Sequence, residues 1–275
     1  MATVLDDIVR AKKEEVQRRK SQISVEELQS KALGVDRPRN FYAAVTKQPL
    51  RKVNLIAEIK KASPSAGVIR ADFDPEKLAR IYTEAGADAL SVLTDEQFFQ
   101  GDLEYIQRVK KVSQLPVLRK DFIIDEYQIY ESRAYGADAI LLITEILTSS
   151  QMIDMLILAG MLKMTSLIEV HSPESLMTVR QTVGFSHEGY SLLGINNRDL
   201  QTQKVDIGTT LRLIDMLEED MRDELVSESG IKTAADIDKL AKAGVLAVLI
   251  GETFMRADNI TAKIEELLGP MPTNE

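Results

Sequence analysis

The sequence predicts an α/β fold, a (β/α)₈ TIM barrel with a helical N-terminal extension. Two observations support it: an internal repeat, and eight strand–helix units within roughly 225 residues, where such barrels have about 250. A doubly wound open sheet is the alternative. That fold normally has fewer strands and a glycine-rich first turn, whereas the loop after the first strand here, residues 63–67, reads SPSAG.

The internal repeat occurs at residues 85–94, 135–144 and 242–251. In each copy a glycine ends a helical pattern, and a strand with apolar residues on both faces follows. Glycine supplies the left-handed conformation that stops a helix. Strands that are apolar on both faces indicate a parallel sheet covered by helices.

The predicted elements alternate between short apolar strands and amphipathic helices. Strands are expected at 53–60, 88–94, 116–120, 138–144, 165–170, 191–196, 224–228 and 245–250. Helices are expected at 75–85, 102–113, 125–135, 148–162, 173–183, 206–219, 232–243 and 256–267. Two helix starts are marked by a capping residue followed by proline, at Asp74-Pro75 and Ser172-Pro173.

The first fifty residues have a different pattern. Residues 3–20 predict an amphipathic helix with apolar residues near one face and charged residues elsewhere. A second helix is expected after Ser24, which begins a capping box with Glu27. We therefore expect residues 1–275 to form a single barrel domain with 1–50 as a helical N-terminal extension.

Composition excludes several classes of function. A net charge of −9 disfavours general nucleic-acid binding, which depends on neutralising phosphates. The absence of cysteine removes disulfides and thiolate nucleophiles, and two histidines give little scope for a metal site. His171, just before a helix start, and His187, in an expected turn, are assigned no catalytic role. The charged N-terminus is no signal peptide, and the apolar runs are too short to span a membrane, so we expect a cytoplasmic protein.

Charged residues gather where the predicted strands end, which is where barrels of this kind carry their active sites. Glu58 and Lys60 share one face of the first strand, and a purely structural ion pair is the alternative explanation for them. Lys120, Glu169 and Glu228 end the third, fifth and seventh strands. Ammonium and carboxylate groups crowded around one rim shift each other's pKa, as general acid–base chemistry requires.

The last two loops favour a phosphate site. Ser229-Gly230 and Gly251-Glu252 follow the seventh and eighth strands, whose loops often bind phosphate in these barrels. Glycine allows close approach to an anion, and backbone N–H groups at a helix start can bind one. Ordinary helix-capping glycines are the alternative. The carboxylate of Glu252 would oppose an anion if it pointed inward.

Six segments resemble the indole-3-glycerol-phosphate synthase family, in the family's order and across essentially the whole chain. They are 56–65 (IAEIKKASPS), 93–101, 118–123 (LRKDFI), 167–171 (LIEVH), 194–200 (GINNRDL) and 227–231 (SESGI). The resemblance implies a barrel whose N-terminal extension lies over the barrel mouth. It implies closure of an indole ring from 1-(2-carboxyphenylamino)-1-deoxyribulose 5-phosphate, with loss of carbon dioxide and water and without cofactor or metal.

The resemblance also implies catalytic roles. Lys120 would be the general acid and Glu169 the general base, while Lys60 would hold the substrate carboxylate. Glu58 and Asn196 would position these groups and the substrate hydroxyls. A lysine that acts as an acid near neutral pH needs a lowered pKa, and we expect burial and a second nearby ammonium to lower that of Lys120.

The remaining implied residues bind substrate. Arg198 would hold the anthranilate end, and Glu228 would contact the substrate near the same rim. Phe98 and Phe99 are expected to face the aromatic ring, with ordinary loop packing as the alternative. The implied phosphate-binding positions are Ser63, Ser229, Gly230, Gly251 and Glu252, the last through its backbone.

The expected partner is a small phosphorylated substrate, with no nucleic acid and no membrane, and the chain is expected to be a monomer. Two other functions remain open: an aldolase that forms a Schiff base on a strand-end lysine, and a non-catalytic barrel that binds a phosphorylated ligand. Contact with other enzymes of tryptophan biosynthesis is left open. The neighbouring isomerase of that pathway uses a catalytic cysteine, which this chain lacks.

Overall fold

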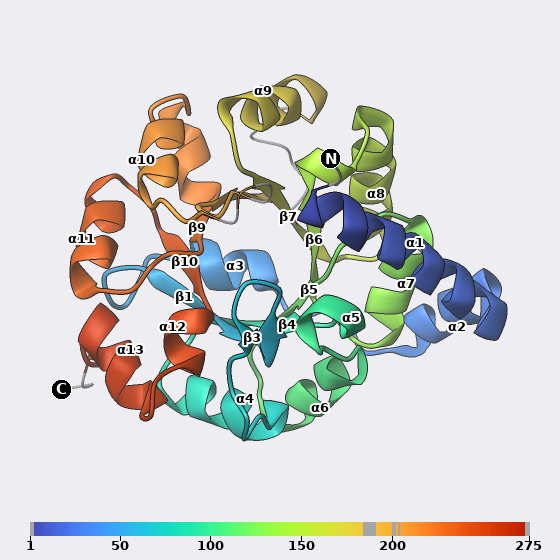
Figure 1. Ribbon diagram of the computed structural model, residues 1–275, viewed down its shortest axis with the longest axis horizontal. Coiled ribbons are helices and arrows are strands. Elements are labelled where there is room, and N and C mark those ends of the chain that lie inside the picture. The colour runs from blue at the N-terminus through green and yellow to red at the C-terminus, as the bar shows by residue number, and fades with distance from the viewer. Residues whose placement is uncertain (1–2, 184–190, 200–201, 203, 273–275) are drawn as a thin grey trace.

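A computed structural model describes residues 3–183, 191–199, 202 and 204–272, in which eight parallel strands form a closed barrel (Figure 1). Neighbours in the barrel follow the chain, and β1 closes it by pairing with both β10 and β4. The predicted (β/α)₈ barrel is confirmed. Its strands are β1 (Asn54–Ile59), β4 (Ala89–Leu93), β5 (Val117–Lys120), β6 (Ala139–Ile143), β7 (Thr165–Val170), β8 (Ser191–Asn196), β9 (Leu225–Glu228) and β10 (Ala247–Ile250).

Helices surround the strands (Figure 1). Those of the outer ring are α4 (Pro75–Glu84), α6 (Glu104–Val112), α7 (Glu126–Ala134), α8 (Ser149–Met161), α9 (Pro173–Thr182), α10 (Gly208–Ile214), α11 (Ala234–Lys242) and α13 (Ile260–Leu268). In the described part of the chain, no helix has both the length and the apolar character needed to cross a membrane.

Two predicted helices are longer than the helices that the structure contains at those positions. The one expected over 206–219 is α10 followed by a separate 3₁₀ helix, η2 (Glu219–Glu224). The one expected over 256–267 is α13, which begins only at Ile260, and a separate short helix that was not predicted, α12 (Glu252–Met255), precedes it. The break before α13 has a local cause, because the side chain of Asn259 accepts a hydrogen bond from the backbone N–H of Ala262 and so begins a new helix.

Short elements in the loops above the barrel were not predicted. They are the hairpin of β2 (Ala62–Ser63) and β3 (Gly67–Val68), helix α5 (Glu96–Phe99) and the 3₁₀ helix η1 (Thr144–Ile146). Each is too short to carry a hydrophobic period. All of them follow a barrel strand directly, so they shape the end of the barrel at which the strands terminate.

The N-terminal extension contains three helices, α1 (Val4–Gln22), α2 (Val25–Gly34) and α3 (Phe41–Thr46). The first two match the prediction, and Ser24 caps α2 by accepting from Glu27 N–H. α1 runs along one side of the barrel opening, and α2 packs beside α7 (Figure 1). The apolar residues Leu28 and Ala32 form that contact together with Tyr127.

The third helix, α3, was not predicted and lies at the opposite end of the barrel. Its Phe41 and Val45 are buried among residues of the barrel interior, such as Leu118. Asn54, the first residue of β1, donates from its side chain to the Val45 carbonyl at 2.9 Å. α3 therefore closes the bottom of the barrel, which leaves the other end for the site.

Candidate active site

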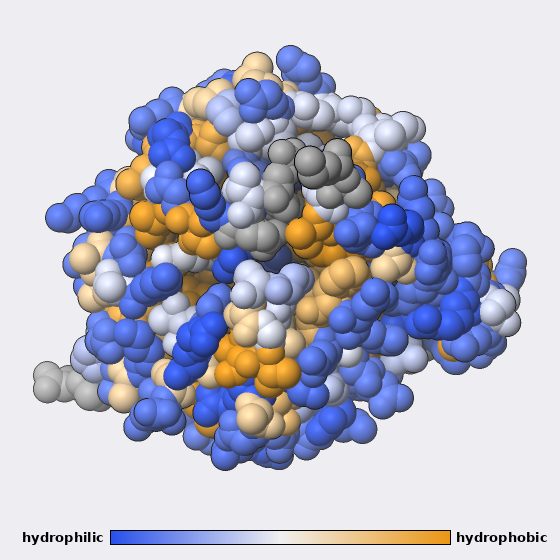
Figure 2. Space-filling model, in the orientation of Figure 1, coloured by the Kyte–Doolittle hydropathy of each residue, from blue (hydrophilic) through white to orange (hydrophobic). Residues whose placement is uncertain are grey.

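A cavity of about 670 Å³ opens at the C-terminal ends of the barrel strands. Every barrel strand contributes a lining residue, and Leu5 and Ile8 of α1 form part of one wall. The face drawn in Figure 2 is hollowed near its centre, with hydrophilic and hydrophobic side chains around the hollow. The predicted site residues that line it are Glu58, Lys60, Ser63, Phe99, Lys120, Glu169, Asn196, Arg198, Glu228, Ser229, Gly230, Gly251 and Glu252.

Lys120, the last residue of β5, carries the central positive charge of this cavity. Its Nζ lies 2.9 Å from Oε2 of Glu169 on β7 and 3.4 Å from Oε2 of Glu228 on β9. Burial works to lower the pKa of Lys120, but Glu169 and Glu228 outweigh it and raise the pKa well above its usual range. The expectation of a lowered lysine pKa was therefore wrong, because carboxylates rather than a second ammonium surround this group.

The two carboxylates beside Lys120 differ in their pKa. Burial works to raise the pKa of Glu169, but Lys120 and then His171 hold it well below its usual range. Burial raises the pKa of Glu228 to about 8; Lys120 opposes this, and the neighbouring Glu169 adds to it. Neither carboxylate oxygen of Glu228 makes a hydrogen bond. One carboxylate is thus held as an anion, and the other is poised to exchange a proton near neutral pH.

Glu58 and Lys60 lie next to each other at the end of β1. Lys60 Nζ is 2.7 Å from Oε1 of Glu58, so the ion pair proposed as the structural alternative exists and also lines the cavity. A side chain at Gly251 would collide with the Glu58 carboxylate, and one at Gly194 would collide with that of Glu228. These two glycines leave the space that the carboxylates occupy.

The predicted phosphate loops meet at one end of the cavity. Ser229 and Gly230 have φ angles of 65° and 79°, the left-handed region that bends this loop sharply after β9. The Glu252 carboxylate is 2.9 Å from Nε of Arg256 and 3.4 Å from Arg198. Burial works to raise the pKa of Glu252, but Arg256 and the other cations lower it. Sequence reasoning missed Arg256, Lys232 and Lys263, which also line this cavity.

Apolar residues form the opposite part of the cavity wall. The rings of Phe99 and Phe122 lie 6.1 Å apart between centroids, and both residues line the cavity. Phe98 is not among the lining residues and packs against the apolar interior cluster. Leu5, from the extension, was not predicted, because only the folded chain brings α1 to the barrel opening.

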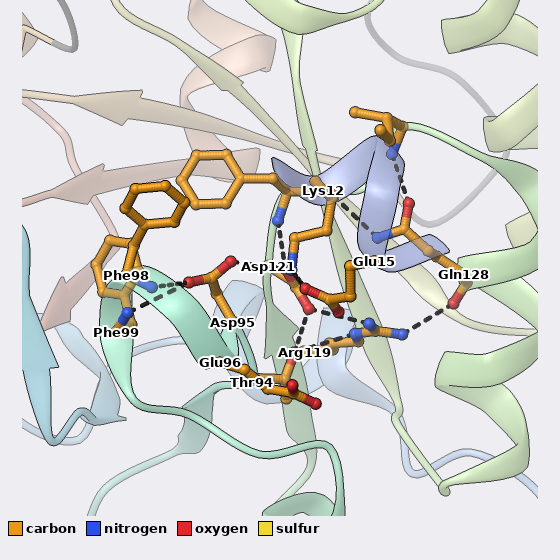
Figure 3. Close-up of polar contacts among 12 residues, drawn as sticks. Lys12, Glu15, Thr94, Asp95, Glu96, Phe98, Phe99, Arg119, Asp121 and Gln128 are labelled. Carbon is orange, nitrogen blue, oxygen red and sulfur yellow. Dashed lines mark hydrogen bonds and ion pairs between the residues drawn. The ribbon is translucent and has the colours of Figure 1, made fainter. Parts of the chain in front are cut away.

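A second group of buried charges adjoins the cavity, which one member, Asp121, also lines (Figure 3). We call it the Lys12 cluster; its members are Lys12, Glu15, Asp95, Arg119 and Asp121. Lys12 Nζ lies 2.8 Å from Glu15, 2.9 Å from Asp95 and 2.8 Å from Asp121, and its side chain is 1% exposed. Asp95 also accepts from the backbone N–H groups of Phe98 and Phe99 and so begins α5.

His171 is the site residue that sequence reasoning set aside. Its Nε2 lies 3.1 Å from Oε1 of Glu169, and its Nδ1 lies 3.0 Å from Oε2 of Glu145. Both are ion-pair contacts whose angles do not qualify as hydrogen bonds. The one feature of the sequence that could have pointed to His171 is its position two residues after Glu169. His187 lies outside the described residues.

Comparison with known proteins agrees with this geometry. The model of the family described as indole-3-glycerol phosphate synthase matches residues 5–267. The chain is 46% identical over 267 residues to the indole-3-glycerol phosphate synthase of Thermoanaerobacter pseudethanolicus, covering 96% of this chain and 97% of that protein. It is 44% identical over 268 residues to that of Neisseria meningitidis, covering 97% of this chain and all of that protein.

Solved structures resemble the chain in fold alone. 3-Hexulose-6-phosphate synthase superimposes with a TM-score of 0.58 at 17% identity, over 78% of this chain and 98% of that one. A mutant tryptophan synthase alpha-subunit from Pyrococcus furiosus gives 0.58 at 13% identity, over 79% and 98%. Because the family model and the relatives span nearly its whole length, the chain belongs to the indole-3-glycerol phosphate synthase family.

Proposed function

We propose that this chain closes the indole ring of 1-(2-carboxyphenylamino)-1-deoxyribulose 5-phosphate to give indole-3-glycerol phosphate, with loss of carbon dioxide and water. The observation that carries the proposal is the buried Lys120–Glu169 pair, 2.9 Å apart, facing a cavity of about 670 Å³ in a chain of this family. The cavity has a cationic side and an apolar side, which suits a substrate with a carboxylate, a phosphate and an aromatic ring.

Lys120 is proposed as the general acid and Glu169 as the general base. The ring carbon that bears the carboxylate attacks the substrate carbonyl, and Lys120 donates a proton to the carbonyl oxygen. Carbon dioxide then leaves and restores the aromatic ring. Lys120 regains a proton from solvent and protonates the new hydroxyl, which departs as water. Glu169 takes the proton that the neighbouring carbon loses in this dehydration. Lys120 and Glu169 favour each other's charged form, so the site without substrate holds a protonated donor and an ionised acceptor.

The other cavity residues are proposed to orient the substrate. Lys60 would bind the substrate carboxylate, and Glu58, Asn196 and Glu228 would hold the hydroxyls and these charged groups in place. The aromatic ring would lie against the apolar wall that contains Phe99. Phe98 would contribute indirectly, by packing within α5, the helix that also carries Phe99. Arg198 would hold the anthranilate end of the substrate.

The phosphate is proposed to bind where the last two loops meet. Ser63, Ser229, Gly230 and Gly251 would contact it, and Glu252 would contribute its backbone. The pairing of the Glu252 carboxylate with Arg256 and Arg198 supports this placement, since the carboxylate is neutralised locally.

The chain is also proposed to work as a single-domain, cytoplasmic monomer on a small phosphorylated substrate. Its net charge of −9 supports the absence of nucleic-acid and anionic-membrane partners. Light scattering of the purified protein should then give a mass near 30.7 kDa. Twice that mass would contradict the monomer.

A fluorescence assay tests the activity. The purified chain, given the substrate, should form a fluorescent indole product together with an equal amount of carbon dioxide. Borohydride should leave the protein unlabelled, because an amine with a raised pKa stays protonated and forms no Schiff base. Covalent labelling without indole would favour the aldolase, and phosphate-ligand binding without turnover would favour the non-catalytic barrel.

A further inference from the structure

His171 stands at the end of β7 and turns its imidazole back between two carboxylates. Glu145, from η1, lies 3.0 Å from Nδ1, and Glu169 lies 3.1 Å from Nε2. The side chain of His171 is 8% exposed, and His171 is not among the residues that line the cavity. Its contact with the proposed acid–base pair is through Glu169.

Glu169 uses its two oxygens differently. Oε1 faces His171, and Oε2 faces Lys120 at 2.9 Å. The side chain is 1% exposed, so water does not replace a lost neighbour easily. An imidazolium on one oxygen fixes the plane of the carboxylate and keeps the other oxygen toward the cavity.

The two carboxylates beside His171 support a cationic imidazole. Oε1 of Glu169 lies 3.1 Å from Nε2, and Oε2 of Glu145 lies 3.0 Å from Nδ1. Burial works to lower the pKa of His171, but Glu145 and Glu169 outweigh it and raise the pKa to about 10. The imidazole is therefore charged throughout the neutral range.

We propose that His171, held between Glu145 and Glu169, is a positioning residue that orients the Glu169 carboxylate toward Lys120 and the substrate. The inference rests on the proposed function, because it assigns no chemistry to His171 itself. Glu145 contributes to the same positioning, because it contacts Nδ1 of the imidazole while Nε2 faces Glu169. The chain His171–Glu169–Lys120–Glu228 then runs across the end of the barrel from β7 through β5 to β9.

Three variants of the full-length chain test the proposal. His171→Leu removes both contacts at similar volume, and we expect kcat to fall about ten-fold, less than the loss of a whole acid–base group. KM should change much less, because His171 does not line the cavity. His171→Asn, which keeps a polar side chain beside Glu169, should have a higher kcat than His171→Leu. Glu145→Gln should give a smaller loss in the same direction.

The pH profile separates positioning from structural support. The charged groups that face Glu169 are Lys120 from β5, Glu228 from β9 and His171. Removing one of the two cations raises the Glu169 pKa, and a base is active only above its pKa. The acid limb of the kcat profile should therefore move to higher pH in His171→Leu and, less, in Glu145→Gln. A residue that only supports the fold would leave that limb in place.

Glu218→Gln is the matched control, because it removes an ion pair with Arg180 of α9 that is remote from the cavity. It should leave kcat and its pH profile unchanged. A wild-type chain without indole product would overturn the proposed function. Normal wild-type turnover, with kcat and its acid limb unchanged in the folded His171→Asn and Glu145→Gln variants, would overturn this inference alone.

Discussion

Two lysine–carboxylate clusters lie side by side in this molecule. Two residues that are adjacent in the chain, Lys120 and Asp121, belong to different clusters. Lys120 pairs with Glu169 and Glu228 in the cavity, whereas Asp121, which also lines the cavity, belongs to the Lys12 cluster (Figure 3). Asp121 has every contact that a carboxylate can use: Lys12 and Phe122 N–H on one oxygen, and Arg119 and the Thr94 hydroxyl on the other. The carboxylate of Glu228 makes no hydrogen bond to any described residue and has only an ion-pair contact of 3.4 Å with Lys120.

The pKa values express the same difference. Burial works to raise the pKa of Asp121, but Lys12 and Arg119 hold it far below its usual range, so it stays charged. The pKa of Glu228 is raised instead. The comparison teaches that buried charge alone does not mark a catalytic site. What distinguishes the site is an incompletely satisfied group that faces a cavity.

The largest effect on activity is expected from Lys120→Met. The substitution removes the proposed acid, and kcat should fall about a thousand-fold, within the range of general acid–base contributions. Indole fluorescence measures it, and calorimetry with inorganic phosphate should show that phosphate binding is retained. Turnover close to wild type would contradict the role of Lys120.

The largest effect on stability is expected from Lys12→Met. It leaves Glu15, Asp95 and Asp121 without their shared cation, and breaking a buried ion pair in this way costs about 3–5 kcal/mol. Urea unfolding measures the loss. Lys20→Met is the control, because Lys20 joins the same helix to Asp125 at a part-exposed site, where a pair contributes about 0.5 kcal/mol. If both variants lost the same free energy of unfolding, the buried Lys12 contacts would contribute no more to stability than the part-exposed Lys20 pair.

Glu228→Gln should stabilise the folded chain and slow the reaction. The pKa of Glu228 is raised in the folded state, so the native protein binds more protons than the unfolded chain between about pH 4.5 and about pH 8. Its contribution to stability is present below that window and is lost as pH rises through it. The free energy of unfolding of the variant should therefore exceed that of wild type by about 1–3 kcal/mol at pH 8, and by less at pH 5.

A constant difference between these two pH values would show that Glu228 does not titrate in this window. The matched variant Asp121→Asn should behave in the opposite way, because its folded-state pKa is lowered. It should lose stability relative to wild type near neutral pH.

The smallest effect is expected from Asp95→Asn, which tests how far the two clusters are independent. The amide oxygen can still accept from Phe98 and Phe99 N–H, but the charge facing Lys12 is lost. We expect a loss of about 1 kcal/mol in stability and a small rise in KM through Phe99, with kcat unchanged. A large fall in kcat would mean that the clusters are coupled.

The sequence was sufficient to predict the barrel, because each strand–helix unit carries its own apolar run and three of them share a glycine that ends the helix before the strand. It also pointed to Lys120, Glu169 and Glu228, since the ends of parallel strands meet at one rim. Each of these signals lies in a short stretch of sequence. The topology of a parallel barrel then predicts that the residues at the strand ends come together.

Long-range contacts could not be predicted in the same way. Lys12 looked like one more charged residue of an amphipathic helix, because its partners Asp95 and Asp121 lie far along the chain. α3 was missed because Phe41 and Val45 find their apolar surroundings only inside the closed barrel. His171 was read as a loop residue, and the sign of the Lys120 shift depended on which charges surround it in space.

Gly194 and Gly251 give the site an unusual sensitivity. Each lies against a carboxylate oxygen, so a single added methyl group would have to turn Glu228 or Glu58 out of place. The polar residues of the site would then all be present, and yet their arrangement would be lost. For engineering and for evolutionary drift alike, two positions that carry no functional group therefore constrain the site.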